Sequence, residues 1–261
     1  MSGIVVLMYH ALYDGSAERE AIAEADRPYA LPVATFRAQL DHLRALGLPI
    51  LDPAALAPAV PPRGVLLTFD DGHASNYRHA FAVLRERGHS AVFFVTTDFI
   101  DRRPGFCTWA QLREMSEAGQ HIGSHGRTHR FFEDLDEAAA RAEFADSKAA
   151  IAGGCGTMPS MLSFPGGRFH PSQLALGRAA GFRWFFSSEV GRNRPERFAS
   201  GQPIRRVAIR EATSAHAFGQ LASGRGVAFW RAATAGRAKR GAQRLLGNRL
   251  YHSLYERLAR G

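Results

Sequence analysis

The chain has 261 residues, 46% of them hydrophobic, so it can bury one substantial core, and a single domain is expected. It contains only two cysteines, and no apolar run approaches the roughly 18 residues of a membrane-spanning helix, which excludes a disulfide framework, a zinc knuckle and a spanning segment. The net charge of +9 lies almost wholly in residues 225–261, where nine Lys or Arg accompany one acid, so an anionic partner is expected there if anywhere.

The first residues of the chain form an apolar segment that ends at Tyr9-His10. No basic stretch precedes it, whereas secretory signal peptides carry one. The pattern therefore predicts a buried strand and a cytoplasmic protein, peripheral at the inner face of the membrane if its basic end binds lipid.

Apolar segments typical of buried strands alternate along the chain with helical patterns. The predicted strands are 3–10, 64–70, 90–97, 121–125, 161–165, 183–188 and 204–210, and the predicted helices are 34–46, 74–88, 108–118, 134–152 and 171–180. This alternation predicts a mostly parallel sheet, either covered by helices or closed into a barrel. The polar stretch 14–32 lacks a core pattern and is predicted to be a long loop, either a lid or a solvated loop without a role.

Two adjacent acids stand at the end of the predicted strand 64–70, in Asp70-Asp71-Gly72. Neighbouring carboxylates are costly to hold together in a partly buried cleft unless a cation or a proton lies between them. Because turns are also rich in Asp and Gly, this segment alone is equally compatible with an ordinary turn.

A histidine pair, His125 and His129, follows another apolar strand. Two histidines at this spacing can direct both imidazoles at one ion when the residues between them form a helical turn, although such pairs are also common on surfaces. Both the acidic and the histidine segments stand at the carboxyl ends of predicted parallel strands, the edge at which α/β folds bind ligands. The combination therefore predicts one site formed by both segments.

The segments Thr68-Phe69-Asp70-Asp71-Gly72 and Ser124-His125-Gly126-Arg127-Thr128-His129 resemble the two signature motifs of the polysaccharide deacetylase family of carbohydrate esterases. The resemblance extends over roughly residues 3–210. It implies an α/β fold with a single distorted (β/α) barrel of about seven strands, in agreement with the strands predicted above. On this basis, residues 1–222 are expected to form the barrel and residues 223–261 a basic helical extension.

The resemblance also implies roles for the residues of the two motifs. Asp71, His125 and His129 are expected to bind a divalent metal ion, with zinc favoured by two imidazoles and one carboxylate, and nickel, cobalt and iron as alternatives. Asp70 is expected to be the general base that takes a proton from the attacking water. The implied partner is an acetylated saccharide.

Many members of the family carry the general acid as a histidine in a Leu-x-His segment near the C-terminus, and nothing after residue 210 matches that segment well. His10 ends the first predicted strand instead, in Leu7-Met8-Tyr9-His10. Some bacterial poly-N-acetylglucosamine deacetylases are similar, with this strand moved to the front by circular permutation. His10 is therefore the predicted general acid, against the alternative of a histidine that is only hydrogen-bonded at a strand end.

The third motif of the family has a partial counterpart that runs from Phe164 to Arg168. Pro165, Gly166 and Gly167 resemble the segment that walls the sugar pocket, where glycine permits close backbone approach. Arg168 is predicted at the same pocket and is a candidate for the arginine that orients the catalytic aspartate in relatives. Trp184 is predicted either to line the pocket, since sugars pack on aromatic faces, or to belong to the core.

The basic extension carries leucines four residues apart among its arginines, namely Leu246, Leu250, Leu254 and Leu258. This spacing predicts an amphipathic basic helix, which either lies on an anionic membrane surface or packs its leucines on the barrel. No specific nucleic-acid partner is expected.

Three hypotheses about function follow. The first is a metal-dependent hydrolase that removes the N-acetyl group from an N-acetylhexosamine unit of a lipid-linked or oligomeric saccharide in polysaccharide biosynthesis. The second keeps the metal site but replaces the sugar with a non-sugar amide or a formamide, because related barrels also cleave such bonds. The third is a catalytically dead module that binds membrane or nucleic acid, suggested by the basic tail and the altered third motif.

Overall fold

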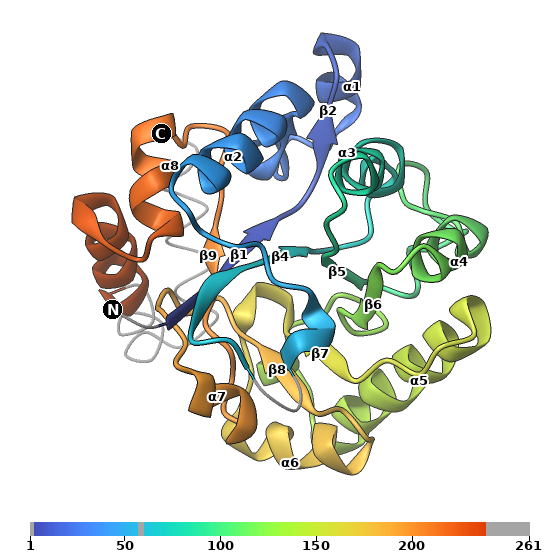
Figure 1. Ribbon diagram of the computed structural model, residues 1–261. Helices are drawn as coiled ribbons and strands as arrows, with labels where there is room; N and C mark the ends of the chain where they lie inside the picture. The colour runs from blue at the N-terminus through green and yellow to red at the C-terminus, as the bar shows by residue number, and fades with distance from the viewer. Residues whose placement is uncertain (1–2, 57–59, 239–261) are drawn as a thin grey trace, which may run out of the picture.

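A curled parallel sheet with helices around its outer face forms the centre of the protein (Figure 1). The computed structural model describes residues 3–56 and 60–238 of the chain. Within these residues, seven strands are hydrogen-bonded in the order β8-β7-β6-β5-β4-β1-β9, and every neighbouring pair is parallel. The strands are β1 (Gly3–Tyr9), β4 (Arg63–Phe69), β5 (Val92–Val95), β6 (His121–Ser124), β7 (Met161–Ser163), β8 (Trp184–Phe186) and β9 (Val207–Ala208). All seven predicted strands are confirmed, with slightly different bounds.

The first strand of the chain lies inside the sheet, between β4 and β9. Its register pairs Tyr9 with Phe69 on β4, and Leu7 with Val207 on β9. The sheet curls into a half-barrel, and a bridge between the end of β8 and the segment just before β9 (Phe186 with Ile204) joins its two edges. The predicted α/β fold with a distorted seven-stranded barrel is therefore confirmed.

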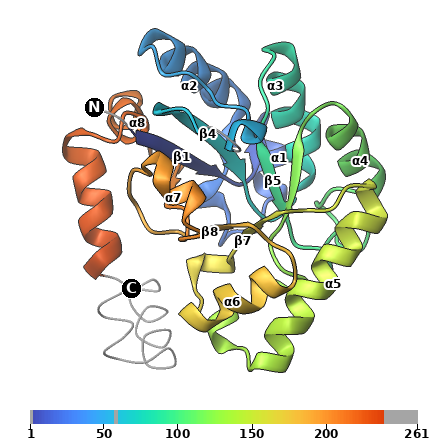
Figure 2. The same ribbon diagram turned by 60° about the horizontal axis from the view of Figure 1, so that its bottom comes forward.

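Helices connect the strands and cover the outside of the sheet (Figure 2). Four of them match predicted helices: α2 (Val33–Ala45), α4 (Trp109–Glu117), α5 (Glu137–Cys155) and α6 (Pro171–Ala179). The predicted helix 74–88 begins as the π-helical segment η3 (Asn76–Phe81) and continues as α3 (Ala82–Glu86). The further helical segments are α7 (Pro195–Ala199), α8 (Ala215–Ala222), η2 (Pro53–Leu56), η4 (Phe132–Asp134) and η5 (Pro165–Gly167).

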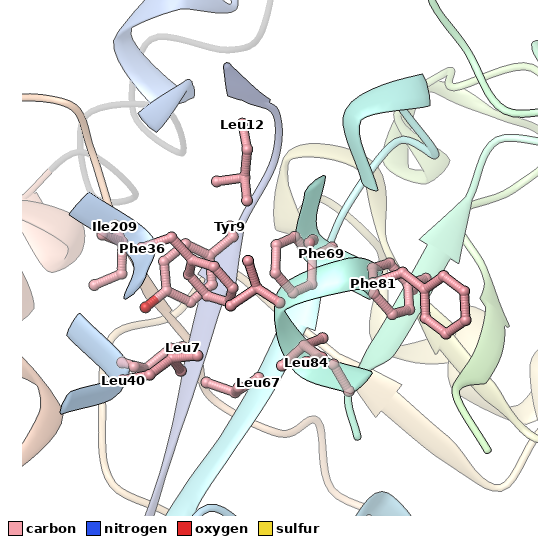
Figure 3. Close-up of a cluster of buried hydrophobic side chains, with 14 of the residues drawn as sticks. Leu7, Tyr9, Leu12, Phe36, Leu40, Leu67, Phe69, Phe81, Leu84 and Ile209 are labelled. Atoms are coloured by element: carbon pink, nitrogen blue, oxygen red, sulfur yellow. The ribbon is translucent and has the colours of Figure 1, made fainter. Parts of the chain in front are cut away.

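The core has two layers because successive side chains of β1 point to opposite faces of the sheet. Tyr9 points toward the helices, and its ring lies 5.3 Å from the rings of both Phe36 on α2 and Phe69 on β4 (Figure 3). Ile4 and Val6 point to the inside of the curled sheet and belong to a second buried cluster there. Both faces of β1 are thus packed, which fixes the position at which the strand ends.

The predicted loop 14–32 has more regular structure than its polar sequence indicates. It contains α1 (Ser16–Ala21) and the single turn η1 (Arg27–Tyr29), and its last residues form β3 (Leu31–Pro32), which pairs with β2 (Leu12–Tyr13). Arg19 of this segment and Tyr13, just before it, both bind Glu211, since Arg19 Nε and the Tyr13 hydroxyl each donate to Glu211 Oε1 at 2.8 Å. The prediction of a loop was wrong because each apolar piece is too short to show a period.

The last described segment, residues 226–238, is helical and lies beside α8 (Figure 2). Phe229 and Ala233 are its buried side chains. The leucines of the predicted amphipathic tail lie outside the described residues, so both the tail helix and the domain division at residue 223 stay predictions. Among the described residues, no helix combines the length and the apolar character needed to cross a bilayer.

Candidate functional site

The two sequence motifs meet at the carboxyl edge of the sheet. Asp70 and Asp71 follow β4, and His125 follows β6, two strands away. Backbone hydrogen bonds hold both points in place, because the N–H of Asp70 donates to Tyr9 O at 2.9 Å and that of His125 to Val95 O at 2.8 Å. The predicted proximity of the acidic and the histidine segments is therefore observed.

The three predicted metal ligands form one cluster. Oδ1 of Asp71 lies 3.4 Å from Nε2 of His125 and 3.2 Å from Nε2 of His129. One ligand atom from each of the three residues lies within 4.8 Å of the others. Two imidazoles and a carboxylate are the donors that zinc and similar first-row ions prefer, so the residues fit the divalent ion predicted for them.

The tautomer of His125 suits a metal ligand. Its Nδ1 lies 2.8 Å from the carbonyl oxygen of Ser163, and because a carbonyl only accepts, Nδ1 carries the proton. Nε2 is then left with its lone pair directed at Asp71. A hydrogen bond of this kind fixes the orientation of a ligand ring and raises its basicity.

Burial raises the pKa of Asp71, but the contacts of its carboxylate with the imidazoles of His125 and His129, together with the influence of His10, bring it well below its ordinary range. For His129, burial lowers the pKa while Asp71 raises it, and the net result is a raised value. The carboxylate is therefore ionised at neutral pH and available as a ligand.

Two of the three cluster residues have a backbone conformation that side chains rarely adopt. The φ angles of Asp71 and His129 are 75° and 67°, in the left-handed region. Such conformations persist only where surrounding contacts impose them, and they are typical of functional sites. In this protein, they turn both side chains toward the same point.

Glu143, a buried residue of α5, holds the loop that carries His129. Its carboxylate accepts hydrogen bonds from the N–H of Arg127 at 2.6 Å, the N–H of Thr128 at 3.1 Å and the Thr128 hydroxyl at 2.6 Å. The close approach requires glycine at position 126, where a Cβ would lie 2.9 Å from Glu143 Oε2. This role could not be predicted from the sequence, because nothing in the helical pattern distinguishes Glu143 from a surface acid.

Replacing Glu143 with alanine is expected to weaken metal affinity by about 10- to 100-fold, since the partner that orients a ligand loop is lost. Asp146→Ala is the matched control, because Asp146 lies on the same helix and contacts Arg127 only through an exposed ion pair of 2.6 Å. Titration of each variant with zinc against a competing chelator measures the effect. Equal affinities for the two variants would show that Glu143 does not support the site.

Asp70, the predicted base, is held by Arg206, which comes from the segment before β9. The guanidinium donates to both carboxylate oxygens at 2.7 Å, while its remaining N–H groups bond Ser163 Oγ at 2.7 Å, Thr68 Oγ1 at 3.3 Å and Ser187 O at 3.0 Å. All five N–H groups of the arginine thus have an acceptor, although only 1% of its surface is exposed. A buried charge pair satisfied in this way is rigid.

The pair fixes the protonation state of Asp70, which is itself 2% exposed. Burial raises the pKa of the Asp70 carboxyl, but the charges of Arg206 and His125 and the hydrogen bonds from Arg206 lower it below its ordinary value. Oδ2 of Asp70 lies 3.8 Å from Nε2 of His125, so the carboxylate stands beside the metal cluster without being part of it. Its position suits a group that accepts a proton.

His10 lies next to Asp70 at the same edge, because Tyr9 pairs with Phe69 and each of the two residues follows its strand by one position. Its ring lies 5.0 Å from the ring of Tyr29. Nδ1 of His10 is buried and has no hydrogen-bond partner among the described residues. The predicted role in proton donation stays a prediction, but the neighbourhood it requires is present.

The N-terminal segment adds a carboxylate, Asp26, that the sequence analysis did not single out. Partial desolvation and the negative charge of Asp71 raise the pKa of Asp26, while the charges of His10 and His129 lower it. Tyr29 of the same segment lies against His10, with 5.0 Å between the two ring centroids. The segment predicted as a lid or a solvated loop therefore borders the site.

The predicted substrate residues fall into two groups. The turn η5, with Pro165 to Gly167, follows β7 at the same edge as the cluster, and its Gly166 has a φ of 61° against the ring of Phe131. Arg168, however, pairs with Glu133 at 2.8 Å, and the arginine on Asp70 is Arg206. The prediction that Arg168 orients the aspartate was wrong, because the contact with Asp70 is made from the interior of the barrel and not from the turn.

Trp184 begins β8, so it lies at the opposite end of its strand from the cluster. It is packed in the buried cluster inside the sheet, and its indole N–H donates to Phe198 O at 3.2 Å. Of the two readings of Trp184, the structure therefore favours the core residue over the pocket wall.

Comparison with known proteins relates this arrangement to one family. Residues 57–185 match the family model described as polysaccharide deacetylase. YxkH of Bacillus subtilis (strain 168), whose name refers to the same family, is 27% identical over 220 residues, covering 82% of this chain and 74% of YxkH. The structure of IcaB from Ammonifex degensii is 28% identical with a TM-score of 0.70, covering 85% of this chain and 96% of IcaB.

The deacetylase PplD of Streptococcus pyogenes, solved in complex with acetate, has a TM-score of 0.70 at 23% identity, covering 81% of this chain and 94% of PplD, and shares the fold. The residues matched by the family model contain the candidate metal ligands and Asp70 but neither His10 nor Arg206. The predicted circular permutation of β1 stays a prediction.

Proposed function

We propose that this chain, whose residues 57–185 match the polysaccharide deacetylase family model, removes the acetyl group from an N-acetylhexosamine unit of a saccharide, with a divalent metal ion at Asp71, His125 and His129. The saccharide is proposed to be a lipid-linked or oligomeric intermediate of polysaccharide biosynthesis. The observation that carries the proposal is the carboxylate of Asp70, which Arg206 holds with its Oδ2 3.8 Å from Nε2 of His125.

In this proposal, each group has one task. Asp71, His125 and His129 would hold the ion, which would lower the pKa of a bound water and polarise the acetyl carbonyl. Asp70 accepts the proton of the water as that water attacks the acetyl carbon. Arg206 holds both carboxylate oxygens, so Asp70 is ionised and oriented before the substrate arrives.

The bond to the sugar nitrogen breaks only if that nitrogen receives a proton, because an amide anion is a poor leaving group. His10 is proposed to donate it, since His10 follows β1 beside Asp70 and its Nδ1 has no partner in the part of the chain that the structure describes. The turn from Pro165 to Arg168 is proposed to wall the sugar. Trp184 has no part in this pocket, because it lies at the other end of β8.

Replacing His10 with alanine is expected to slow cleavage of an N-acetyl amide by about 10²- to 10⁴-fold, the usual range for loss of a general acid. Cleavage of an activated ester such as 4-nitrophenyl acetate is expected to change far less, because its leaving group departs without a proton. The two rates are measured on the same preparations. Equal losses on the two substrates would assign His10 a structural role instead.

The proposed substrate class is tested by mass spectrometry of reactions with chito-oligosaccharides, β-1,6-linked N-acetylglucosamine oligomers and a formamide. Loss of acetyl from either saccharide, dependent on zinc or cobalt after chelation, is the expected result. Activity on the formamide alone would show that the substrate is a non-sugar amide and not a saccharide. A preparation that binds no divalent ion and gains no activity from one would overturn the proposal of an enzyme.

A further inference from the structure

The amino-terminal edge of the sheet, opposite the candidate site, carries a cavity lined by arginines. Its volume is about 590 Å³, and four arginines face it (Arg192, Arg194, Arg197 and Arg205) against one acid, Glu196. Its position follows from two contacts: Asn193 bridges Ile4 at the start of β1, and Phe198 accepts from Trp184 at the start of β8. This cavity is therefore separate from the metal cluster.

Two arginines that are adjacent in the sequence extend toward opposite edges of the sheet. Arg206 extends through the interior of the barrel to Asp70, whereas the next residue back, Arg205, lines the cavity. Arg205 is partly balanced by Glu189 at 3.4 Å, yet its Nε is buried and has no hydrogen-bond partner within residues 3–56 and 60–238. Burial and the charge of Arg205 lower the pKa of Arg197, as expected of cations crowded together. A bound anion would relieve this crowding, and phosphate suits the planar fork of arginine.

A second hollow of about 420 Å³ adjoins the first and shares Arg192, Arg194 and Arg205 with it. Its other wall is apolar and aromatic, formed by Phe229, Trp230 and Ala233 of the helix 226–238. The ligand that fits both hollows has an anionic head beside an apolar part.

The helix 226–238 presents apolar side chains to solvent next to these arginines. Within the described residues, four large apolar side chains are strongly exposed, and two of them are Val227 at 59% and Trp230 at 54%. The helix carries Arg231 and Arg237 and no acid. Exposed tryptophan with arginine is typical of surfaces that meet the interface of a bilayer.

We propose that this arginine groove, formed by Arg192, Arg194, Arg197 and Arg205 with the helix 226–238, binds the phosphate of an anionic phospholipid at a membrane surface. Trp230 and Val227 enter the interfacial layer beside the bound headgroup. The opposite edge of the sheet, with the metal cluster, then faces the aqueous phase.

The test uses the full chain and vesicles of phosphatidylcholine with and without phosphatidylglycerol. The double variant Arg194→Gln/Arg197→Gln is expected to bind the anionic vesicles about 30-fold less tightly in sedimentation, on the usual contribution of each arginine near such a surface. The matched control is Arg44→Gln/Arg141→Gln, which removes the same charge from exposed positions on α2 and α5. Thermal unfolding of each variant checks that it is folded.

If both double variants bound the anionic vesicles equally weakly, net charge alone would explain the effect and the proposal would be overturned. Unchanged vesicle binding by both variants would overturn it as well. If the Arg194→Gln/Arg197→Gln variant lost binding of inorganic pyrophosphate but kept vesicle binding, the ligand of the groove would be a soluble phosphate. This result would also overturn the proposal. The parent chain gives an independent measurement, because Trp230 is expected to shift its fluorescence to the blue on anionic vesicles. No such shift relative to a Trp230→Phe variant would contradict the proposed contact.

Discussion

Replacing Arg206 with methionine is expected to reduce turnover by about 10²- to 10³-fold and the free energy of unfolding by about 3–5 kcal/mol. The change leaves Asp70 buried at 2% exposure without the cation that holds both of its oxygens. Steady-state kinetics and urea unfolding measure the two losses. Arg205→Met is the matched control, because it removes the adjacent, partly exposed arginine and is expected to change the free energy of unfolding by less than about 1 kcal/mol.

The Arg206→Met variant also distinguishes a role in positioning the base from a role in stabilising the fold. Arg206 and its hydrogen bonds oppose the effect of burial on Asp70, so their loss raises the pKa of that carboxyl. Because the base works only when ionised, the acidic limb of the pH–rate profile is expected to move to higher pH. Arg206→Lys keeps the charge but not the bidentate fork, and an intermediate rate is expected. An acidic limb that stays in place would mean that Arg206 contributes only to the fold.

Replacing Asp70 with asparagine is expected to lower turnover by about 10²- to 10⁴-fold while the metal stays bound. Asparagine keeps the shape of the side chain but cannot accept a proton, and the cluster of Asp71, His125 and His129 does not include Asp70. Metal content by elemental analysis and activity are measured on one preparation. Near-native activity would show that another group is the base.

His125→Ala serves as the contrast to Asp70→Asn and is expected to lose the metal together with the activity. The matched control is His121→Ala, at the opposite end of the same strand, where the ring lies 3.3 Å from Asp52 and away from the cluster. Asp71→Asn gives a finer contrast, since asparagine tolerates the positive φ of 75° at this position and only the charge is removed. Retention of metal by His125→Ala would remove His125 from the ligand set.

The metal cluster could be predicted because a simple rule of α/β folds governs it. Asp71 and His125 each follow an apolar strand, and the carboxyl ends of parallel strands share one edge. The strand pattern was clear in the sequence, so their proximity followed without knowledge of the strand order. His10 could be placed at this edge for the same reason.

Arg206 and Glu143 could not be predicted, because their contacts depend on details of packing. An arginine within the predicted strand 204–210 was visible, but its partner depends on which face points into the barrel and on how far the side chain reaches. Glu143 differs from the exposed acids of α5 only by the loop that folds over it. The role of Trp184 turned on its place at the start of β8 and not on its residue type.

The contact between Arg206 and Asp70 also bears on the order in which the protein folds, because the two residues are 136 positions apart in the chain. During synthesis, β1 and β4 emerge early and can pair, but the arginine emerges only when most of the chain has been made. Contacts of such separation form late in folding. A nascent chain that ends before Arg206 already contains Asp71, His125 and His129, so the ability to hold a metal ion would precede the ability to act on a substrate.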